Sequence, residues 1–557
     1  MKTRQWIKSG SPWIWLTGGM ISLSMIMVFG LLALIAVRGL GHFWPSPVVE
    51  FEFQATTETE PARILGIPMR SQNVSGYVLR ESGHQIPEEI ELTQRFLIKQ
   101  GNRDLTGRDF AWYPEPLITE WITPQEAMVI ERREWGDFIG FLREVKKDGE
   151  VIAEGLAGRE DLLPLVDRAN ELAGAINRIE RFQIGGLNLQ IERIRLAERS
   201  LSRAVDLDPE ERRLRMAEFQ AERDELERQF EVLNAERLEL MQQMRRDSLV
   251  AESMDGRRLE IPLANVVHVH WPNDMNLVEK IGHYVTMIWN FLSGFPREAN
   301  TEGGIFPAIF GTVLMVILMS IVVTPMGVMA AIYLREYAKQ GPMVRLVRIC
   351  VNNLAGVPSI VFGVFGLAFF IYFVGGNLDR IFYQDALPAP TFGTPGLLWA
   401  SLTLALLTLP VVIVSTEEGL ARIPSTIRHG SLALGATKAE TLWRTVIPLS
   451  TPAMMTGLIL AVARAAGEVA PLMLVGVVKL APNLPVDGHF PYLHLERKFM
   501  HLGFHIYDVG FQSPNVEASR PLVYATALVL VLIIITLNLT AITIRNYLRE
   551  KYRSESD

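Results

Sequence analysis

Two ionisable side chains lie inside a long apolar stretch near the C-terminal end of the chain. Arg464 and Glu468 are four residues apart within residues 446–478, so in a helix they share one face and can form an ion pair. A charge near the centre of a bilayer costs roughly 3 kcal/mol on insertion scales, which makes it a functional candidate. The pair predicts either a polar path through the membrane, with Arg464 available to an oxyanion, or an ion pair that joins two helices.

A polar segment just before this stretch, residues 417–450, contains a second candidate. It predicts a short helix over 437–446, bounded by Gly435 and Pro448. Such a helix would expose Trp443 and Arg444, and a short helix with exposed side chains can fit a groove on a partner protein. The alternative interpretation is an ordinary amphipathic connector between two membrane helices.

Two pairs of histidines have the residue type of metal ligands. His268 and His270 would share one face of a strand, and His501 and His505 would share one face of a helix. The sequence gives neither pair a recognisable third ligand or the Cys/His spacing of a structural zinc site. We therefore expect satisfied surface or interfacial histidines and no bound metal.

Long apolar windows predict the elements that position these residues. Of the 557 residues, 49% are hydrophobic and 21% are charged, so the two kinds must be segregated along the chain. The net charge of −7 averages a charged middle and apolar flanks, and indicates no acidic or basic partner such as nucleic acid. About 20 apolar residues are needed to cross a bilayer. The windows of this length are residues 13–37, 305–334, 349–378, 395–416, 446–478 and 521–544.

The distribution of lysine and arginine predicts the orientation of these spans. Most of the basic residues in short loops fall at the N-terminus, after the second and fourth windows and at the C-terminus. The two short loops on the other side hold only Arg380, Lys479, Arg497, Lys498 and Arg520. The positive-inside rule therefore predicts that both termini, 1–12 and 551–557, are cytoplasmic. Residues 38–304 are expected outside, in the periplasm of a cell with two membranes.

This external insertion divides into three predicted parts. Residues 38–159 contain strand-like runs at 128–132 and 138–142 and a turn at 147–149, typical of a small β-containing or α/β domain. Residues 160–248 show apolar positions at 3–4 spacing among many charges, which predicts an antiparallel coiled-coil hairpin with a break near Pro209. Residues 249–304 are expected to be a return segment.

The hairpin has two possible roles. Its charges are either the solvated face of a stalk or a docking surface for another protein. Arg223 and Arg237 fall on its seam and would set the register of the two helices.

The run LALGATKAETLWRTVIP in residues 432–448 resembles the loop that binding-protein-dependent ABC importers insert into their ATPase subunits. The family pattern is Glu-Ala-Ala, three residues, Gly, nine residues, and Ile-x-Leu-Pro. Gly435 takes the glycine position and Pro448 closes the motif, whereas His429 stands where glutamate is expected. The resemblance implies that this segment couples to an ATPase. The coupling residues that it implies are His429, Gly430, Ser431, Leu434, Gly435, Ala436, Thr437, Trp443, Arg444 and Pro448.

Four further segments resemble the PstA family of phosphate transporter permeases. They are residues 303–312, 331–338, 353–363 and 463–472, within a region of resemblance over 300–550. The resemblance implies a mainly α, six-span permease with a MetI-like core over 305–550, which moves inorganic phosphate across the inner membrane. It also implies a PstB-like ATPase dimer, a PstC-like second permease and a PstS-like external phosphate-binding protein as partners.

The chain itself is not expected to be an enzyme. It lacks the G-x-x-x-x-G-K-[ST] phosphate-binding loop, so ATP and Mg²⁺ are expected on the separate ATPase and no cofactor on this chain. Two other functions remain open. The first is a permease for another oxyanion, such as molybdate, sulfate or phosphonate. The second is a membrane-anchored coiled-coil scaffold or signalling protein.

Overall fold

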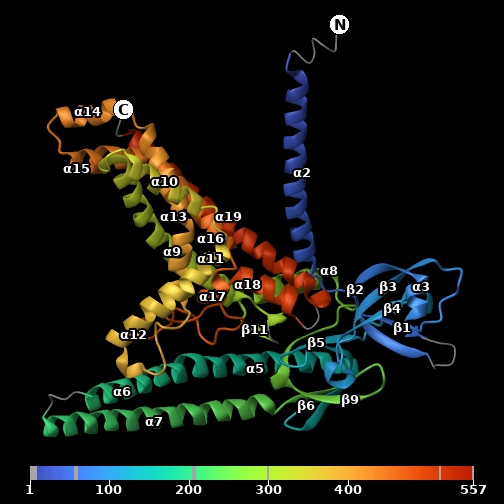
Figure 1. The fold of residues 1–557 in the computed structure, drawn as a ribbon. Helices are drawn as coiled ribbons and strands as arrows, with labels where there is room; N and C mark the ends of the chain where they lie inside the picture. The colour runs from blue at the N-terminus through green and yellow to red at the C-terminus, as the bar shows by residue number, and fades with distance from the viewer. Residues whose placement is uncertain (1–8, 55–60, 204–207, 298–299, 514–515, 555–557) are drawn as a thin grey trace.

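The computed structural model describes residues 9–54, 61–203, 208–297, 300–513 and 516–554 (Figure 1). The outermost residues of both predicted cytoplasmic termini lie outside these ranges. Within them, six helices are long and apolar enough to cross a membrane, which confirms the predicted six-span architecture. These helices are Trp13–Gly41, Phe306–Tyr337, Ser359–Phe382, Leu397–Arg422, Lys438–Gly467 and Ser519–Glu550.

The membrane helices form a bundle around α13 (Leu397–Arg422). The surrounding elements are α9 (Phe306–Ile332), η6 (Tyr333–Tyr337), α11 (Ser359–Phe365), η7 (Gly366–Gly375), α12 (Gly376–Phe382), α16 (Ile447–Gly467) and α19 (Val516–Ser554). Gly457 of α16 faces Ser415 of α13, where an added Cβ would lie 2.8 Å from the serine Cβ. Small residues at such points let helix backbones approach closely. By contrast, α2 (Ser11–Gly41) stands beside the bundle for most of its length (Figure 1).

The boundaries of all six spans differ from the predicted windows, and those of the third and fifth differ most. The third begins at Ser359 rather than at 349, because the chain breaks before Pro358 and the preceding residues form a separate helix, α10 (Pro342–Leu354). The fifth ends at Gly467 rather than at 478. Glu468 has an extended backbone (φ −80°, ψ 129°) and a short helix, α17 (Leu472–Val475), follows Pro471. In a continuous helix the ring of Pro471 would clash with the carbonyl of Gly467 four residues earlier and would donate no hydrogen bond to it, so the helix ends at Gly467.

The external region contains two antiparallel sheets. The first has the order β1-β2-β3-β4 and consists of β1 (Val49–Phe53), β2 (Ala62–Ser75), β3 (Leu92–Lys99) and β4 (Phe110–Pro114). The second has the order β10-β5-β6-β8-β9, with β7 also paired to β6. Its strands are β5 (Met128–Arg132), β6 (Phe138–Lys147), β7 (Glu150–Glu154), β8 (Ser248–Glu252), β9 (Arg258–Pro262) and β10 (Val266–His270).

The second sheet corrects one predicted boundary. The strands predicted at 128–132 and 138–142 are present, and Asp148 and Gly149 have positive φ at the predicted turn. Residues 249–304, however, are not only a return segment, because β8, β9 and β10 complete the sheet that β5, β6 and β7 begin. The helical hairpin is therefore an insertion within one sheet, between β7 and β8.

The hairpin consists of two antiparallel helical arms. One arm is continuous through α5 (Arg159–Arg178), η3 (Ile179–Ile184) and α6 (Gly185–Arg203), and the other is α7 (Pro209–Arg245). Leu187, Ile194 and Leu226 are buried between them. Arg223 lies 3.1 Å from Glu198 and Arg237 lies 3.0 Å from Glu180, so both seam arginines pair across the arms. Figure 1 shows the hairpin running across the end of the bundle near α12.

Candidate functional site

The segment that resembles an ATPase-coupling loop lies at the end of the bundle opposite the hairpin (Figure 1). It folds into α14 (Ser425–Ala433), α15 (Lys438–Thr441) and η9 (Leu442–Val446), and η9 continues into α16. Gly435 has φ +91°, a conformation that glycine adopts without steric cost, and it allows the turn between α14 and α15. We call α14, α15 and η9 the coupling surface.

The coupling surface exposes large apolar side chains. Leu434 is 91% exposed and Trp443 is 73% exposed. The other residues implied by the motif divide into two groups. His429, Gly430, Gly435, Thr437 and Arg444 are exposed, whereas Ser431, Ala436 and Pro448 are partly buried. Exposed leucine and tryptophan side chains rimmed by polar residues are typical of a protein interaction site.

Local hydrogen bonds hold the shape of this surface. The hydroxyl of Thr437 accepts from the backbone N–H of Glu440, and the Glu440 carboxylate accepts from the backbone N–H of Thr437. This reciprocal pair is a capping box, and it fixes the start of α15. The hydroxyls of Ser431 and Thr441 lie 2.9 Å apart and join α14 to α15. The turn between the two helices is therefore fixed on both sides.

An ion pair that sequence reasoning missed fastens the coupling surface to the second span. Arg428 of α14 donates to the Glu336 carboxylate of η6 at 2.9 Å, and both side chains are largely buried. Arg428 also donates to the carbonyls of Leu420 and Ile423, at 2.7 and 2.8 Å. The two partners are 92 residues apart in sequence, so no local pattern could have connected them. The contact joins α14 to the end of span 2.

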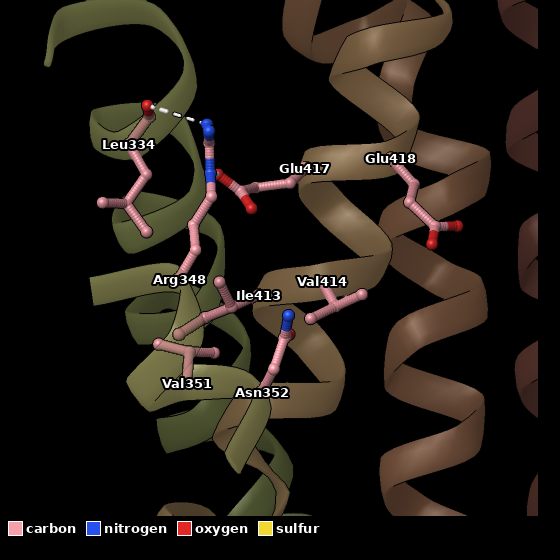
Figure 2. Close-up of a pocket in the computed structure, with 8 residues that line it drawn as sticks. All are labelled: Leu334, Arg348, Val351, Asn352, Ile413, Val414, Glu417 and Glu418. Atoms are coloured by element: carbon pink, nitrogen blue, oxygen red, sulfur yellow. Dashed lines mark hydrogen bonds and ion pairs between the residues drawn. The ribbon is translucent and has the colours of Figure 1, made fainter. Parts of the chain in front are cut away.

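A second ion pair lies beside a hollow of about 120 Å³ on the same side of the bundle (Figure 2). Arg348 of α10 contacts Glu417 of α13 at 3.1 Å and also donates to the carbonyl of Leu334. Figure 2 shows Glu418 on the far side of α13, pointing away from Arg348. The pair joins α10 to span 4 beneath the coupling surface, and the hydrogen bond to Leu334 joins α10 to the end of span 2.

Arg464 and Glu468 lie close together, but not on one continuous helix. Arg464 is in the last turn of α16, and Glu468 follows the helix end. Arg464 Nε lies 3.5 Å from Glu468 Oε1, and the two side chains are 32% and 20% exposed. The residues after them pack against α11, where an added Cβ on Gly363 would lie 2.7 Å from the Cα of Pro471. Arg464 is therefore half-buried beside a helix break, with part of its guanidinium accessible.

The structure places the two histidine pairs in different surroundings. His268 and His270 do have a third candidate ligand, His283 in α8 (Leu277–Ser293), which sequence spacing did not reveal. His501 and His505 are not surface residues, since their exposed fractions are 1% and 2%. The ring of His501 instead accepts a hydrogen bond from the N–H of Gly503 at the start of α18 (Leu502–Tyr507).

Comparison with known proteins matches the C-terminal part of the chain. Residues 323–554 match the model of the binding-protein-dependent transport system inner membrane component. The chain is 37% identical over 194 residues to phosphate transport system permease protein PstA of Mycobacterium leprae, covering 35% of this chain and 58% of that protein. It is 33% identical over 244 residues to PstA 1 of Mycobacterium tuberculosis H37Rv, covering 44% of this chain and 70% of that protein.

Two further matches extend the comparison. The chain is 30% identical over 247 residues to phosphate transport system permease protein PstA of Yersinia pestis, covering 44% of this chain and 74% of that protein. Among solved structures, an inward-facing MetNI methionine ABC transporter matches 47% of this chain and 98% of its own, with 16% identity and a TM-score of 0.32.

Proposed function

Because the chain belongs to the PstA family of phosphate transport system permeases, we propose that it is the subunit of an ATP-driven importer through which inorganic phosphate crosses the inner membrane. The proposal rests on the features that lie together within residues 323–554. This one stretch, which matches the permease family model, contains the coupling surface, both of its supporting ion pairs and Arg464.

The coupling surface would be moved by the conformational change that ATP drives in the ATPase subunits. Closure of an ATPase dimer would press on Leu434 and Trp443. The Arg428–Glu336 contact would pass this movement to span 2, and the continuous backbone from η9 into α16 would pass it to span 5. Two spans would then move together, which is what a change between outward-facing and inward-facing states requires.

Arg464 is the residue that would contact the substrate. A guanidinium has a planar set of donors that matches the oxygens of phosphate, and it stays charged at any physiological pH. The contact between Arg464 Nε and Glu468 Oε1 is long, at 3.5 Å, so an incoming anion can compete with Glu468 for the guanidinium. Import of an anion into a negative interior costs roughly 2.3 kcal/mol per charge per 100 mV, so the path must be gated by ATP rather than open.

The partners and the orientation follow from the same proposal. The exposed coupling surface would bind a PstB-like ATPase dimer in the cytoplasm, and a PstC-like permease would complete the membrane part. Residues 38–304, at the opposite end of the bundle, would lie in the periplasm and meet a PstS-like binding protein. Both termini would then be cytoplasmic.

The test is uptake of radiolabelled phosphate by phosphate-starved cells that carry or lack this gene, with sulfate and molybdate as competitors. We expect loss of high-affinity uptake in cells without the gene, and competition by unlabelled phosphate alone. Unchanged phosphate uptake, or competition by molybdate or sulfate at low concentration, would point to another oxyanion and overturn the proposed substrate.

A further inference from the structure

Three histidines from two elements meet where the second external sheet contacts the helix that precedes span 2. His268 and His270 lie on β10, and His283 lies on α8. Each offers a ring nitrogen, and the three nitrogens lie within 4.8 Å of one another. We propose that His268, His270 and His283 form a binding site for a divalent transition metal ion, with Zn²⁺ as the ion that suits it best.

The fold holds these three rings together independently of any metal. Residues two apart on a strand point to the same face, so β10 presents His268 and His270 side by side. Their ring centroids are 5.7 Å apart. On the other element, the side chain of Asn276 accepts from the backbone of Val278 and Glu279, and this capping box fixes the start of α8. His283 follows two turns later, with its ring centroid 4.4 Å from that of His270.

Two nitrogens of the cluster are in close contact. His268 Nε2 and His283 Nδ1 lie 3.2 Å apart, close to the separation of two nitrogens bound to one metal. Zn–N bonds of about 2.0–2.1 Å in a tetrahedron place the nitrogens about 3.4 Å apart. His270 Nδ1 is buried and has no hydrogen-bond partner among the described residues. An unpaired buried polar atom is unfavourable, and a metal bond at this nitrogen would satisfy it.

The protonation state of the cluster suits metal binding. Burial lowers the pKa of all three histidines, that of His283 to about 4, and the neighbouring rings lower the pKa values of His270 and His283 further. Glu131 faces His268 across β5 and β10 and opposes this effect for His268, but its carboxylate is paired with Arg297. A lowered pKa favours the neutral imidazole ring, which is the form that binds metal.

The ligand set indicates which ions the site would accept. Imidazole nitrogens favour Zn²⁺, Cu²⁺ and Ni²⁺, whereas Mg²⁺ and Ca²⁺ prefer oxygen ligands. Three histidines leave one position of a Zn²⁺ tetrahedron for water. Because Glu131 is already engaged by Arg297, water rather than this carboxylate would be the fourth ligand.

A metal at this place would fasten the external sheets to the membrane core. α8 has one fully buried side chain, Phe291, near its C-terminal end, so its N-terminal half has few other anchors. From α8 the chain passes through β11 (Pro296–Arg297) and β12 (Glu302–Gly303) directly into α9. The ion would therefore connect β10 to the segment that enters span 2.

The test uses the full-length protein purified in detergent and stripped with a chelator. We expect it to take up about one Zn²⁺ per chain, measured by elemental analysis after desalting, and to rise in melting temperature on Zn²⁺ addition. Co²⁺ in place of Zn²⁺ should give the visible absorption bands of a tetrahedral nitrogen site. Retention of no metal by the folded wild-type protein, with no Co²⁺ bands, would overturn the proposal.

Variants separate this site from adventitious binding. His283→Gln keeps a polar side chain of similar size, and we expect it to weaken Zn²⁺ binding at least tenfold and to remove the rise in melting temperature. His84→Ala, which changes a histidine of the external region far from the cluster in sequence, should bind Zn²⁺ like the wild type. Equal binding by His283→Gln and the wild type would place the ion elsewhere. Size-exclusion profiles check that each variant is folded, and the Co²⁺ spectrum of the wild type tests the site even if a variant fails to fold.

Discussion

Arg464 is the residue on which the proposed transport path depends most directly. Its guanidinium is partly exposed beside the break at Gly467, and only Glu468 pairs with it among the described residues. Loss of one charge-assisted hydrogen bond costs about 1.5–3 kcal/mol, so Arg464→Ala should lower phosphate uptake roughly tenfold or more. Two measurements test this: the uptake of labelled phosphate by cells, and the amount of assembled complex in the membrane.

Two comparisons make this prediction specific. Arg464→Lys keeps the charge but loses the planar donor set, so it should restore part of the uptake. Arg380→Ala changes an exposed arginine at the end of span 3 and should leave uptake unchanged. Wild-type uptake by Arg464→Ala would show that Arg464 only joins α16 to its surroundings.

The Arg428–Glu336 pair gives a second prediction at this scale. Both side chains are less than one-fifth exposed, so removing one partner leaves a largely buried charge. Breaking such a pair costs up to roughly 3–5 kcal/mol when it is fully buried, and less here. Arg428→Met and Glu336→Gln should each lower the melting temperature of the purified protein, and the double variant should lower it by less than the sum. Additive losses would mean that the two residues act independently.

Single residues also show what the sequence could and could not predict. Arg464 and Glu468 could be recognised as candidate functional residues because charged residues are rare in apolar windows. His283 and Arg428 were missed because each finds its partner through tertiary packing, with no local spacing to indicate it. Glu468 was placed on a helix because composition alone did not weigh Gly467 and Pro471 against the apolar residues around them.

At the scale of elements, the coupling surface is the clearest case for an experiment. Trp443 is largely exposed on η9, which runs straight into α16. We expect Trp443→Ala to lower binding-protein-stimulated ATP hydrolysis by the reconstituted complex. Burial of one aromatic side chain at an interface often contributes about 2 kcal/mol or more, so the affinity of the coupling surface for the ATPase subunit should fall about thirtyfold. Excess ATPase subunit should restore part of the activity. The matched control is Tyr77→Ala, an exposed aromatic residue of the external region. Equal loss in both variants would argue against a specific contact.

The elements were predictable where a local pattern determines them. Apolar windows gave six spans, alternation gave β5 and β6, and the turn at Asp148 was evident from its residue types. The second sheet was only half predicted, because β6 pairs with β8 across an insertion of about a hundred residues. This pairing depends on the hairpin bringing β8 back beside β6. A pattern within a short window of the sequence cannot predict it.

At the scale of the molecule, the hairpin is attached to the permease core through one arm. Arg203 of α6 donates to the carbonyl of Gln384 at 2.9 Å and pairs with Asp385 at 3.2 Å, and Arg199 donates to the carbonyl of Asp385. Farther along, Arg193 contacts the carbonyl and the ring of Phe490. These partners lie in the two loops that join span 3 to span 4 and span 5 to span 6. A stalk pointing into solvent would make none of these contacts, so the arrangement favours a platform at the external end of the core.

This attachment predicts the effect of shortening the hairpin. Removing residues 185–234 and joining the arms by a short glycine turn keeps α5, whose Leu162 and Val166 belong to the core of the second sheet. We expect the shortened protein to assemble and to keep basal ATP hydrolysis, but to lose most of its stimulation by the phosphate-binding protein. The double variant Arg199→Ala/Arg203→Ala keeps the full length and should show a smaller loss, because exposed and partly exposed arginine contacts contribute about 1 kcal/mol each or less. Full stimulation of the shortened protein would reduce the hairpin to a spacer, whereas an equal loss in the double variant would assign the effect to the contacts of Arg199 and Arg203 with the external loops rather than to the rest of the hairpin surface.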